Sequence, residues 1–336
     1  MKFGSVRIGI IGCGSMAREH AAALSVTSGV RIAACADIDP EKARCFAAEY
    51  GVNRYTDDAG QVIRDPGIDA VYICTRHDSH AALAVAAAKA RKHMFIEKPL
   101  AMSTAEARSI GHAVRTARVR CMIGFKLRFH RTVSLLRVAV PRPVLSIAQV
   151  CDEIWPDGFW ANDPREGGGN ILSQGGHAVD LLCAFHAAPP IRVHAEGGTL
   201  THQGAAVPDT ACAVVLFSDG SVASLAIADA GTSPVVSKFS FQVMDGKRCA
   251  HLTDRCLSLA VSEPGRVEIA REETDRSVLR ENAHFLHCLR TGDPFRTGFR
   301  AGMRAVVLIE AILESIATGL PRRVDPSEWL IEGIRD

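Results

Sequence analysis

The first 125 residues of the chain alternate short apolar runs with longer alanine-rich segments. The apolar runs, rich in β-branched residues, cover residues 6–11, 30–36, 70–74, 93–96 and 119–123. The segments between them have the length of helices and cover residues 16–27, 40–50, 80–91 and 104–117. Strands that are apolar throughout are typical of a parallel sheet with helices on both faces. The alternation therefore predicts an α/β domain with a doubly wound parallel sheet over residues 1–124.

The pattern changes after about residue 125. Residues 144–270 are mostly strand-like, and two pairs of runs separated by turn residues predict hairpins, at 211–217 with 222–228 and at 238–244 with 247–252. Helices are expected at residues 171–185, 277–290 and 299–318. Residues 125–336 are therefore predicted to form an α+β domain with a large, mostly antiparallel sheet.

Charge and composition disfavour several classes of protein. Lys and Arg number 39 against 37 Asp and Glu, and this net charge of +2 lacks the basic excess that attracts polyanions. Aromatic residues make up only 6% of the chain, which disfavours platforms for base stacking. No stretch approaches the ~20 apolar residues that span a bilayer. We therefore expect neither a nucleic-acid partner nor a membrane segment.

The eleven cysteines are scattered along the chain without a CxxC spacing. Several lie inside apolar runs, where a thiol packs as a small hydrophobic group, and none is spaced with histidines as in a zinc site. The first residues lack the apolar core of a secretory signal. These features predict free thiols, no metal and a cytoplasmic protein.

A glycine-rich sequence directly follows the first apolar run. Gly12-Cys13-Gly14-Ser15-Met16-Ala17 has the pattern G-x-G-x-x-A. Gly12 would allow a tight turn, and Gly14 would let a pyrophosphate approach the backbone. A helix that begins at Ser15 and Met16 would offer free N–H groups and its positive dipole end to the phosphates. The pattern predicts a dinucleotide site, with a simple glycine turn as the alternative.

The second predicted strand ends at Asp37, 23 residues after Gly14. A carboxylate at this place accepts hydrogen bonds from the adenosine ribose hydroxyls. It would repel a 2′-phosphate, and Ile38 follows where an Arg would be needed to receive that group. The sequence therefore predicts NAD rather than NADP. The alternative is that Asp37 only caps the end of the strand.

The fifth predicted strand ends in Glu97-Lys98-Pro99. Residues just beyond the carboxyl ends of parallel strands face the ligand crevice, so Lys98 is expected where a nicotinamide would bind. A buried ammonium is costly without a partner, and a surface lysine is the alternative.

With these motifs the sequence resembles the Gfo/Idh/MocA oxidoreductases, the relatives of glucose–fructose oxidoreductase and inositol dehydrogenase. The resemblance extends over nearly the whole chain. Besides the glycine pattern and Glu97-Lys98-Pro99, its blocks are Ile123-Gly124-Phe125-Lys126-Leu127-Arg128-Phe129 and the glycine-rich stretch from Gly167 to Asp180. The resemblance implies an oxidoreductase that transfers hydride between a secondary alcohol of a sugar, inositol or related polyol and the nicotinamide.

The resemblance also implies roles for single residues. Lys98 and His177 match the catalytic lysine and histidine, and a cis peptide is expected at Lys98-Pro99. A histidine suits proton removal near neutral pH, and an ammonium stabilises a developing alkoxide. We therefore expect His177 to be the general acid/base and Lys98 its electrostatic support, with a packing role as the alternative for His177. Thr75 and Glu97 are expected beside the cofactor.

One position departs from the family pattern. Many members carry Asp four residues before the catalytic histidine, where this chain has Ser173. The loss of that charge has three explanations: a substrate of different polarity, compensation by another carboxylate such as Asp180 or Glu97, or weak or absent activity. Asp180 matches the family's H-x-x-D, where it contacts substrate or orients the helix.

Three further side chains are candidates for substrate contact. Trp160 could stack on sugar C–H groups or pack in an interface. Arg128 and Arg165 could bind a carboxylate or phosphate of the substrate, with a solvated surface arginine as the alternative. His77 and His80 lie near the same edge, but no third ligand accompanies them, so no metal is expected there.

The resemblance leaves two other functions open. One is a non-catalytic NAD(H)-binding regulator or sensor on the same fold, and the other is an NADH-dependent reductase of an imine or enediol. The resemblance further implies a homodimer or homotetramer that forms through the C-terminal sheet.

Overall fold

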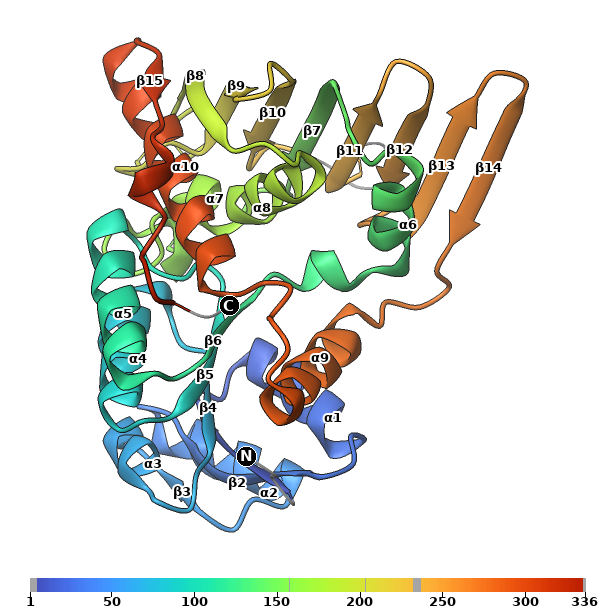
Figure 1. Ribbon diagram of the computed structural model, residues 1–336. Helices are drawn as coiled ribbons and strands as arrows, with labels where there is room; N and C mark the ends of the chain where they lie inside the picture. Colours follow the sequence, from blue (N-terminus) through green and yellow to red (C-terminus); the bar gives the residue numbers. More distant parts are fainter. Residues whose placement is uncertain (1–4, 157, 203, 232–236, 335–336) are drawn as a thin grey trace. The chain divides into compact units, whose positions relative to one another are not determined.

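The computed structural model describes residues 5–156, 158–202, 204–231 and 237–334 (Figure 1). The chain divides into two compact units. The first comprises Met1–Lys126, Arg276–Met303 and Ile331–Asp336, and the second comprises Leu127–Asp275 and Arg304–Leu330. The expected division after residue 124 lies close to the first crossing at Lys126. The sequence did not indicate that Arg276–Met303 returns to the first unit, because helical periodicity does not reveal which sheet a helix covers.

The first unit is built on a six-stranded sheet in the order β3-β2-β1-β4-β5-β6. Each neighbouring pair of strands is parallel. The parallel sheet predicted from the five apolar runs is confirmed, and the two-residue strand at Tyr55–Thr56 was not predicted. The strands are β1 (Val6–Ile11), β2 (Val30–Ala36), β3 (Tyr55–Thr56), β4 (Ala70–Ile73), β5 (His93–Glu97) and β6 (Cys121–Gly124). The order reverses direction between β1 and β4, which makes the carboxyl ends of these two strands the point where ligands bind in such sheets.

Helices follow the strands in alternation. They are α1 (Ser15–Ser25), α2 (Pro40–Tyr50), α3 (Ala59–Arg64), the short η1 (His77–Ser79), α4 (His80–Lys89), α5 (Thr104–Ala117) and, from late in the chain, α9 (Ser277–Thr291). The Asp39 carboxylate accepts from the N–H groups of Glu41 and Lys42 and begins α2. Helix α9 packs beside α1, although about 250 residues separate them in the sequence (Figure 1). The first sheet therefore receives its last covering helix from the C-terminal part of the chain.

The second unit is built on a nine-stranded sheet in the order β14-β13-β12-β11-β7-β10-β9-β8-β15. Its strands are β7 (Leu145–Cys151), β8 (Pro190–Gly198), β9 (Thr210–Phe217), β10 (Val222–Ala228), β11 (Phe239–Met244), β12 (Cys249–Thr253), β13 (Ser258–Glu263), β14 (Arg266–Arg271) and β15 (Arg322–Arg323). Both expected hairpins are confirmed, as β9 with β10 and β11 with β12. The sheet is mostly antiparallel as predicted, with β7 and β10 forming a parallel pair.

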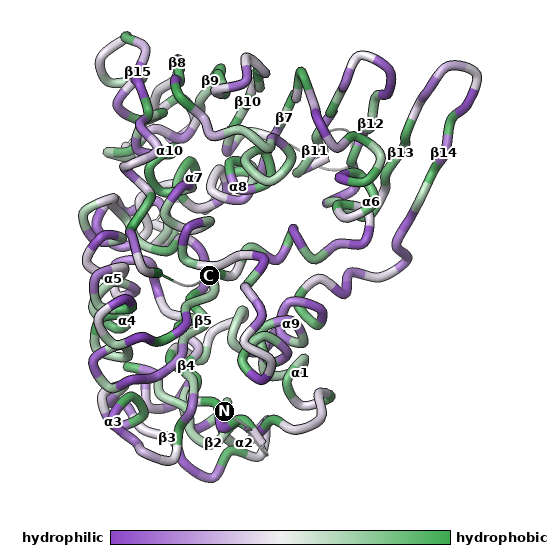
Figure 2. The backbone as a smooth tube through the Cα atoms, viewed as in Figure 1, coloured by the Kyte–Doolittle hydropathy of each residue, from purple (hydrophilic) through white to green (hydrophobic). Residues whose placement is uncertain are grey.

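Buried and more exposed residues alternate along these strands, so the two faces of the second sheet differ in burial. In β10, for example, Ala223, Leu225 and Ile227 are buried and the residues between them are half-exposed. Figure 2 shows both hydrophobic and hydrophilic residues along the strands of this sheet. Helices α6 (Arg131–Ala139) and α8 (Gly175–Phe185) pack on this sheet. One face therefore belongs to the core and the other is open.

The helix expected at residues 171–185 is interrupted. It consists of α7 (Gly169–Ser173) and α8, with Gln174 between them. A Cβ on Gly175 would lie 2.6 Å from Cδ1 of Ile227, so a glycine is required where α8 begins on the sheet. Glycine also weakens a continuous helix, so the residue that allows the close approach favours the break as well.

The remaining elements are short or close the chain. They are η2 (Lys126–Phe129), η3 (Trp160–Asn162), α10 (Phe299–Thr318) and η4 (Pro326–Glu328). Among the helices of the described residues, none is both long and apolar enough to span a membrane.

Candidate active site

The glycine-rich loop follows β1 and is shaped by the close approach of β4. Gly12 has φ +86°, and a Cβ there would lie 2.6 Å from the carbonyl oxygen of Cys74. Gly14 is the N-cap of α1 and is exposed, and an added Cβ would meet no described atom within 4 Å. Ser15 and Met16 form the first turn, whose N–H groups have no partner within the helix. The loop thus has the cradle that a pyrophosphate needs.

Asp37 lies at the end of β2 and is half-buried. Its Oδ2 accepts from the Cys13 N–H at 2.7 Å, and its Oδ1 accepts from the Asp39 N–H at 3.0 Å. The carboxylate therefore connects the glycine loop to the start of α2. Each carboxylate oxygen thus accepts one local hydrogen bond, as expected if Asp37 caps the strand end. Each oxygen also retains a second lone pair that could accept from a ligand.

Glu97 ends β5 and turns its carboxylate into the first unit. Its Oε1 lies 2.8 Å from Nε2 of His20 on α1, and its Oε2 accepts from the Lys98 N–H at 3.2 Å. A Cβ on Gly124 of the neighbouring strand would lie 2.8 Å from Oε1, so glycine leaves room for this carboxylate. Burial would raise the pKa of Glu97, but His20 and the positive charges of Lys98 and Lys126 hold it below its usual value. Glu97 is therefore an internal anion next to Lys98.

Lys98 is half-buried, and the Lys98-Pro99 peptide is cis, as expected. A second histidine connects this segment to Thr75 at the end of β4. His80 places Nδ1 2.7 Å from the carbonyl oxygen of Pro99 and Nε2 3.2 Å from that of Thr75. The Thr75 hydroxyl accepts from Ser79 Oγ at 2.6 Å. The ends of β4 and β5 are therefore tied together beside Lys98.

In the second unit, His177 lies in the first turn of α8 and is 5% exposed. Its backbone N–H donates to the Gln174 carbonyl at 3.1 Å, and its ring lies edge-to-face with Phe239 at 5.9 Å between centroids. Ser173, the last residue of α7, is also buried. The imidazole therefore lies beside an aromatic ring, on a helix without an acidic residue in its first turn.

Asp180, one turn after His177, pairs with Arg128. The guanidinium donates from Nε to Oδ2 at 2.6 Å and from Nη2 to Oδ1 at 2.5 Å. The two side chains are 1% and 9% exposed. The expectation of a solvated Arg128 is therefore wrong, whereas Arg165, with 89% of its side chain exposed, fits that alternative. Both oxygens of the Asp180 carboxylate are therefore engaged by Arg128, which fits the alternative that Asp180 orients α8.

The loop after β7 contains a cluster of aromatic side chains that is hydrogen-bonded to acidic residues. Phe159 lies 5.2 Å from Trp155 and 5.6 Å from Trp160, measured between ring centroids. The Trp155 indole donates to Asp152 at 3.2 Å, and its backbone N–H donates to Asp229 at 3.3 Å. Trp160 is half-buried in this cluster, which agrees with the packing alternative.

Sequence reasoning missed the polar side chains of this region. Asp229 also lies 2.6 Å from Nε2 of His202, and Asp152 accepts from Lys238 at 2.6 Å. Burial raises the pKa of Asp229. A signal was present in the sequence, because both carboxylates directly follow strands of the core.

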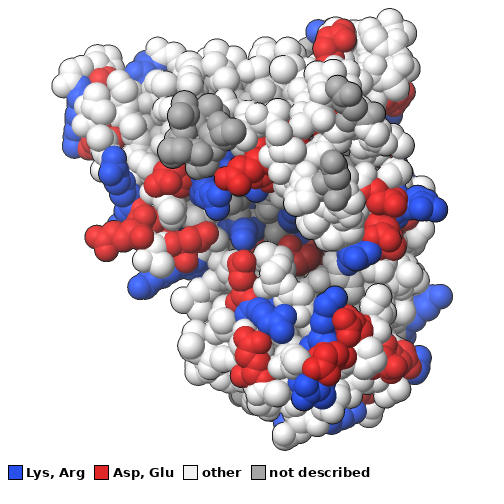
Figure 3. Space-filling view, turned by 180° about the vertical axis from the view of Figure 1, so that it is seen from behind, with Lys and Arg blue, Asp and Glu red and all other residues white. Residues whose placement is uncertain are grey.

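Two observations bear on other ligands. Within the described residues, no group of three or more His, Cys, Asp or Glu side chains could hold a metal ion. On the face shown in Figure 3, Lys and Arg are interspersed with Asp and Glu rather than gathered into one basic patch.

The first unit defines the class of the protein, a dinucleotide-binding protein with a Rossmann fold. Comparison with known families gives two consecutive matches. The "Oxidoreductase family, NAD-binding Rossmann fold" matches residues 6–125, and the "GFO/IDH/MocA C-terminal domain" matches residues 143–241. Together they span well over half of the chain in the order in which the family carries them. The chain belongs to the Gfo/Idh/MocA family and is an NAD-dependent oxidoreductase.

Individual relatives agree with this assignment. The chain is 29% identical over 228 residues to myo-inositol 2-dehydrogenase of Thermotoga maritima, covering 65% of this chain and 66% of that one. It is 30% identical over 183 residues to scyllo-inositol 2-dehydrogenase (NAD(+)) of Bacillus subtilis, covering 54% and 51%. In fold it is similar to levoglucosan dehydrogenase in complex with NADH and L-sorbose, with a TM-score of 0.88, 21% identity and coverage of 97% and 100%.

Proposed function

We propose that the protein oxidises a secondary alcohol of a sugar, an inositol or a related polyol with NAD as hydride acceptor. The observation that carries the proposal is the pair of chemical groups in family positions: Lys98 beside the buried Glu97 carboxylate, and His177 in the first turn of α8. The named activities of the inositol and levoglucosan dehydrogenases support the substrate class.

The chemistry follows from what each side chain can do. The bound nicotinamide would accept the hydride, and the hydroxyl proton must leave as the C–H bond breaks. His177 would take that proton, because a neutral imidazole is a general base suited to pH values near neutrality. Lys98 would hold the developing alkoxide by charge and hydrogen bonding.

Asp37 supports NAD over NADP. Its carboxylate is fixed at the carboxyl end of β2 by the N–H groups of Cys13 and Asp39. In this position it would accept from ribose hydroxyls and repel a 2′-phosphate.

A second candidate function is a non-catalytic NAD(H)-binding regulator. The observation in its favour is the uncharged Ser173, together with the engagement of Asp180 by Arg128. Both Lys98 and His177 remain in place, which favours the enzyme.

The test is NAD reduction over a panel of sugars, inositols and sugar nucleotides, with His177→Ala as the control. The proposal expects turnover on at least one polyol and a loss of about 10²–10⁴-fold in kcat in the variant. Activity with NADH on imines or enediols alone would assign the reductase function. NADH binding without turnover in either direction would assign the regulator.

The open face of the second sheet supports a homodimer or homotetramer. Leu145, Ile147 and Val214 point outward from β7 and β9 and are 37%, 40% and 51% exposed. Apolar side chains spread over a sheet face are typical of a surface that is covered in the assembled protein. Sedimentation at micromolar concentration would show a monomer if this proposal is wrong. The eleven free thiols support a reducing, cytoplasmic location.

A further inference from the structure

The two sequence neighbours of Lys98, Glu97 and Pro99, each contact a buried histidine of the first unit. His20 contacts the Glu97 carboxylate, and His80 contacts the Pro99 carbonyl. Both histidines are fully buried. We propose that His20 and His80 are positioning residues that fix the Lys98 ammonium for catalysis, a proposal that rests on the function proposed for Lys98.

The protonation of His20 follows from its partners. Asn282 on α9 donates from Nδ2 to the Val278 carbonyl at 2.8 Å, and the same nitrogen lies 2.9 Å from Nδ1 of His20. The amide nitrogen is a donor, so Nδ1 accepts and the ring proton is on Nε2. His20 therefore donates from Nε2 to Glu97, and Asn282 fixes this tautomer.

Glu97 transmits this contact to Lys98. One oxygen accepts from His20 and the other from the Lys98 backbone N–H. The His20 ring is held in turn by edge contacts with Phe95 and Tyr72, at 4.7 and 5.4 Å between centroids. The carboxylate therefore has one orientation, and its charge remains next to the lysine.

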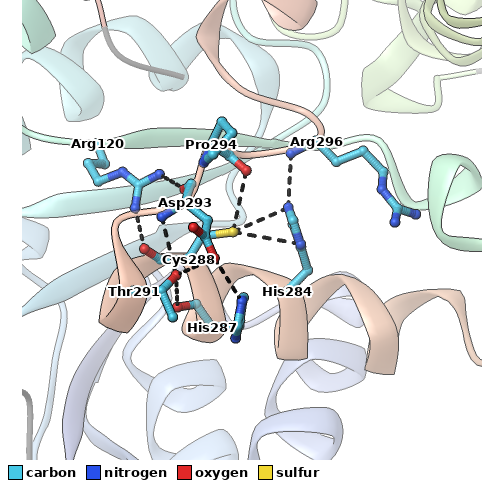
Figure 4. Close-up of polar contacts among 8 residues, drawn as sticks. All are labelled: Arg120, His284, His287, Cys288, Thr291, Asp293, Pro294 and Arg296. Carbon is cyan, nitrogen blue, oxygen red and sulfur yellow. Dashed lines mark hydrogen bonds and ion pairs between the residues drawn. The ribbon is translucent and has the colours of Figure 1, made fainter.

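Helix α9, which carries Asn282, is itself fastened to the sheet (Figure 4). Arg120, at the start of β6, donates to the carbonyl oxygens of Cys288 and Asp293. Nε2 of His284 accepts from the Arg296 N–H at 2.9 Å. These contacts hold the C-terminal end of α9, so Asn282 meets His20 from a fixed helix.

His80 acts on the other side of Lys98. Burial lowers the pKa of His80, which favours the neutral ring with one N–H group. We assign this proton to Nδ1, whose carbonyl partner on Pro99 is nearer than the Thr75 oxygen at Nε2. The charged and titratable groups around the segment are then Glu97, His20, His80, Lys98 and Lys126.

The experiment reads Lys98 directly, without a substrate. Reductive ¹³C-methylation labels the lysines, and the Lys98 resonance is identified by its loss in Lys98→Arg. The variants are His20→Leu, which removes the donor, and His20→Gln, which retains an N–H near the Nε2 position. His80→Leu tests the second contact. The control is His112→Leu, an exposed histidine on α5 of the same unit.

The proposal expects the Lys98 resonance to move in His20→Leu and His80→Leu and to stay in place in His20→Gln and His112→Leu. Once a substrate is known, kcat should fall about 10–100-fold in the two affected variants, with the KM for NAD within about twofold. If His20→Leu does not fold, Asn282→Ala replaces it, because it frees the His20 tautomer without changing the ring.

An unchanged Lys98 resonance in both leucine variants, or in Asn282→Ala and His80→Leu, would overturn the positioning role. Failure of the proposed function is a different result. In that case the resonance moves as expected, but Lys98→Met turns over polyols at the wild-type rate.

Discussion

The environments of Lys98 and His177 are built on opposite principles. Lys98 has a buried carboxylate beside it, and that carboxylate is held by a chain of polar groups that reaches α9. His177 lies on an apolar helix, edge-on to Phe239, and the nearest acid on its helix face is bound to Arg128. The difference matches the roles proposed above: an ammonium that stabilises an alkoxide is itself stabilised by a neighbouring anion, whereas a general base needs its ring free to take a proton.

The largest expected effect comes from a substitution in the environment of His177. Arg128→Met leaves the 1%-exposed Asp180 carboxylate without its partner. Breaking a buried ion pair on one side costs about 3–5 kcal/mol, so the urea midpoint of unfolding should fall steeply. Arg128→Met/Asp180→Leu should recover part of the loss. A single variant as stable as the wild type would mean that the pair does not orient α8.

The next largest effect is expected from a substitution of Lys98 itself. Lys98→Met should lower kcat about 10²–10³-fold, because it removes the charge that stabilises the alkoxide. The dissociation constant of NADH, measured by fluorescence titration, should change little. The comparison of the two environments fails if the variant loses cofactor binding while its turnover at saturation is retained.

Each unit also contains a neutral histidine that responds to acid. The pKa of His186 is lowered to about 4 by burial, and that of His284 is lowered to about 4 by burial and nearby positive charges. The unfolded state binds more protons between about pH 6.5 and 4, so stability is full above this window and is lost as pH falls through it. For His186 the loss is about 2 kcal/mol at pH 5. His186→Gln should reduce the difference between urea midpoints at pH 7 and pH 5.

His186 has a defined proton arrangement for this test. Ser221 Oγ donates to Asp219 at 2.6 Å, so it accepts from Nδ1 of His186 at 2.8 Å. Nε2 then accepts from Ser146 Oγ at 2.9 Å. A second proton on the ring would displace the Ser146 hydroxyl. A wild-type protein with equal midpoints at both pH values would contradict the assignment.

The smallest effect concerns the cofactor. Asp37→Ser removes the charge at the end of β2 while keeping an acceptor for the Cys13 N–H. We expect kcat/KM for NAD to fall about tenfold and that for NADP to rise, a change of about 1.4 kcal/mol for NAD. If the ratio of the two cofactors does not move, Asp37 is only the local cap.

Most of the first sheet could be predicted from the sequence. Most of its strands are apolar runs with few polar residues, and the segments between them have the length of helices. The short α6 was missed, because β-branched residues such as Thr132 and Val133 weaken its helical signal. The return of α9 could not be predicted, since an apolar face specifies burial but not the neighbour.

The candidate site shows the same limit. The glycine loop and Glu97-Lys98-Pro99 are local motifs and could be found in the sequence. The partner of Asp180 could not, because Arg128 lies 52 residues away and spacing shows only which helix face Asp180 occupies. His20 did leave a signal: it is a polar residue between the buried Ala17 and Ala21 on an alanine-rich helix.

The late arrival of α9 has a consequence for biosynthesis. Asn282 meets a histidine that leaves the ribosome 262 residues earlier. At about 5–20 residues per second, α9 is translated roughly 8–30 s after β6. During that interval the side of α1 that α9 covers in the finished protein has no covering helix. A stop codon anywhere before α9 would release a fragment that cannot complete its own interior.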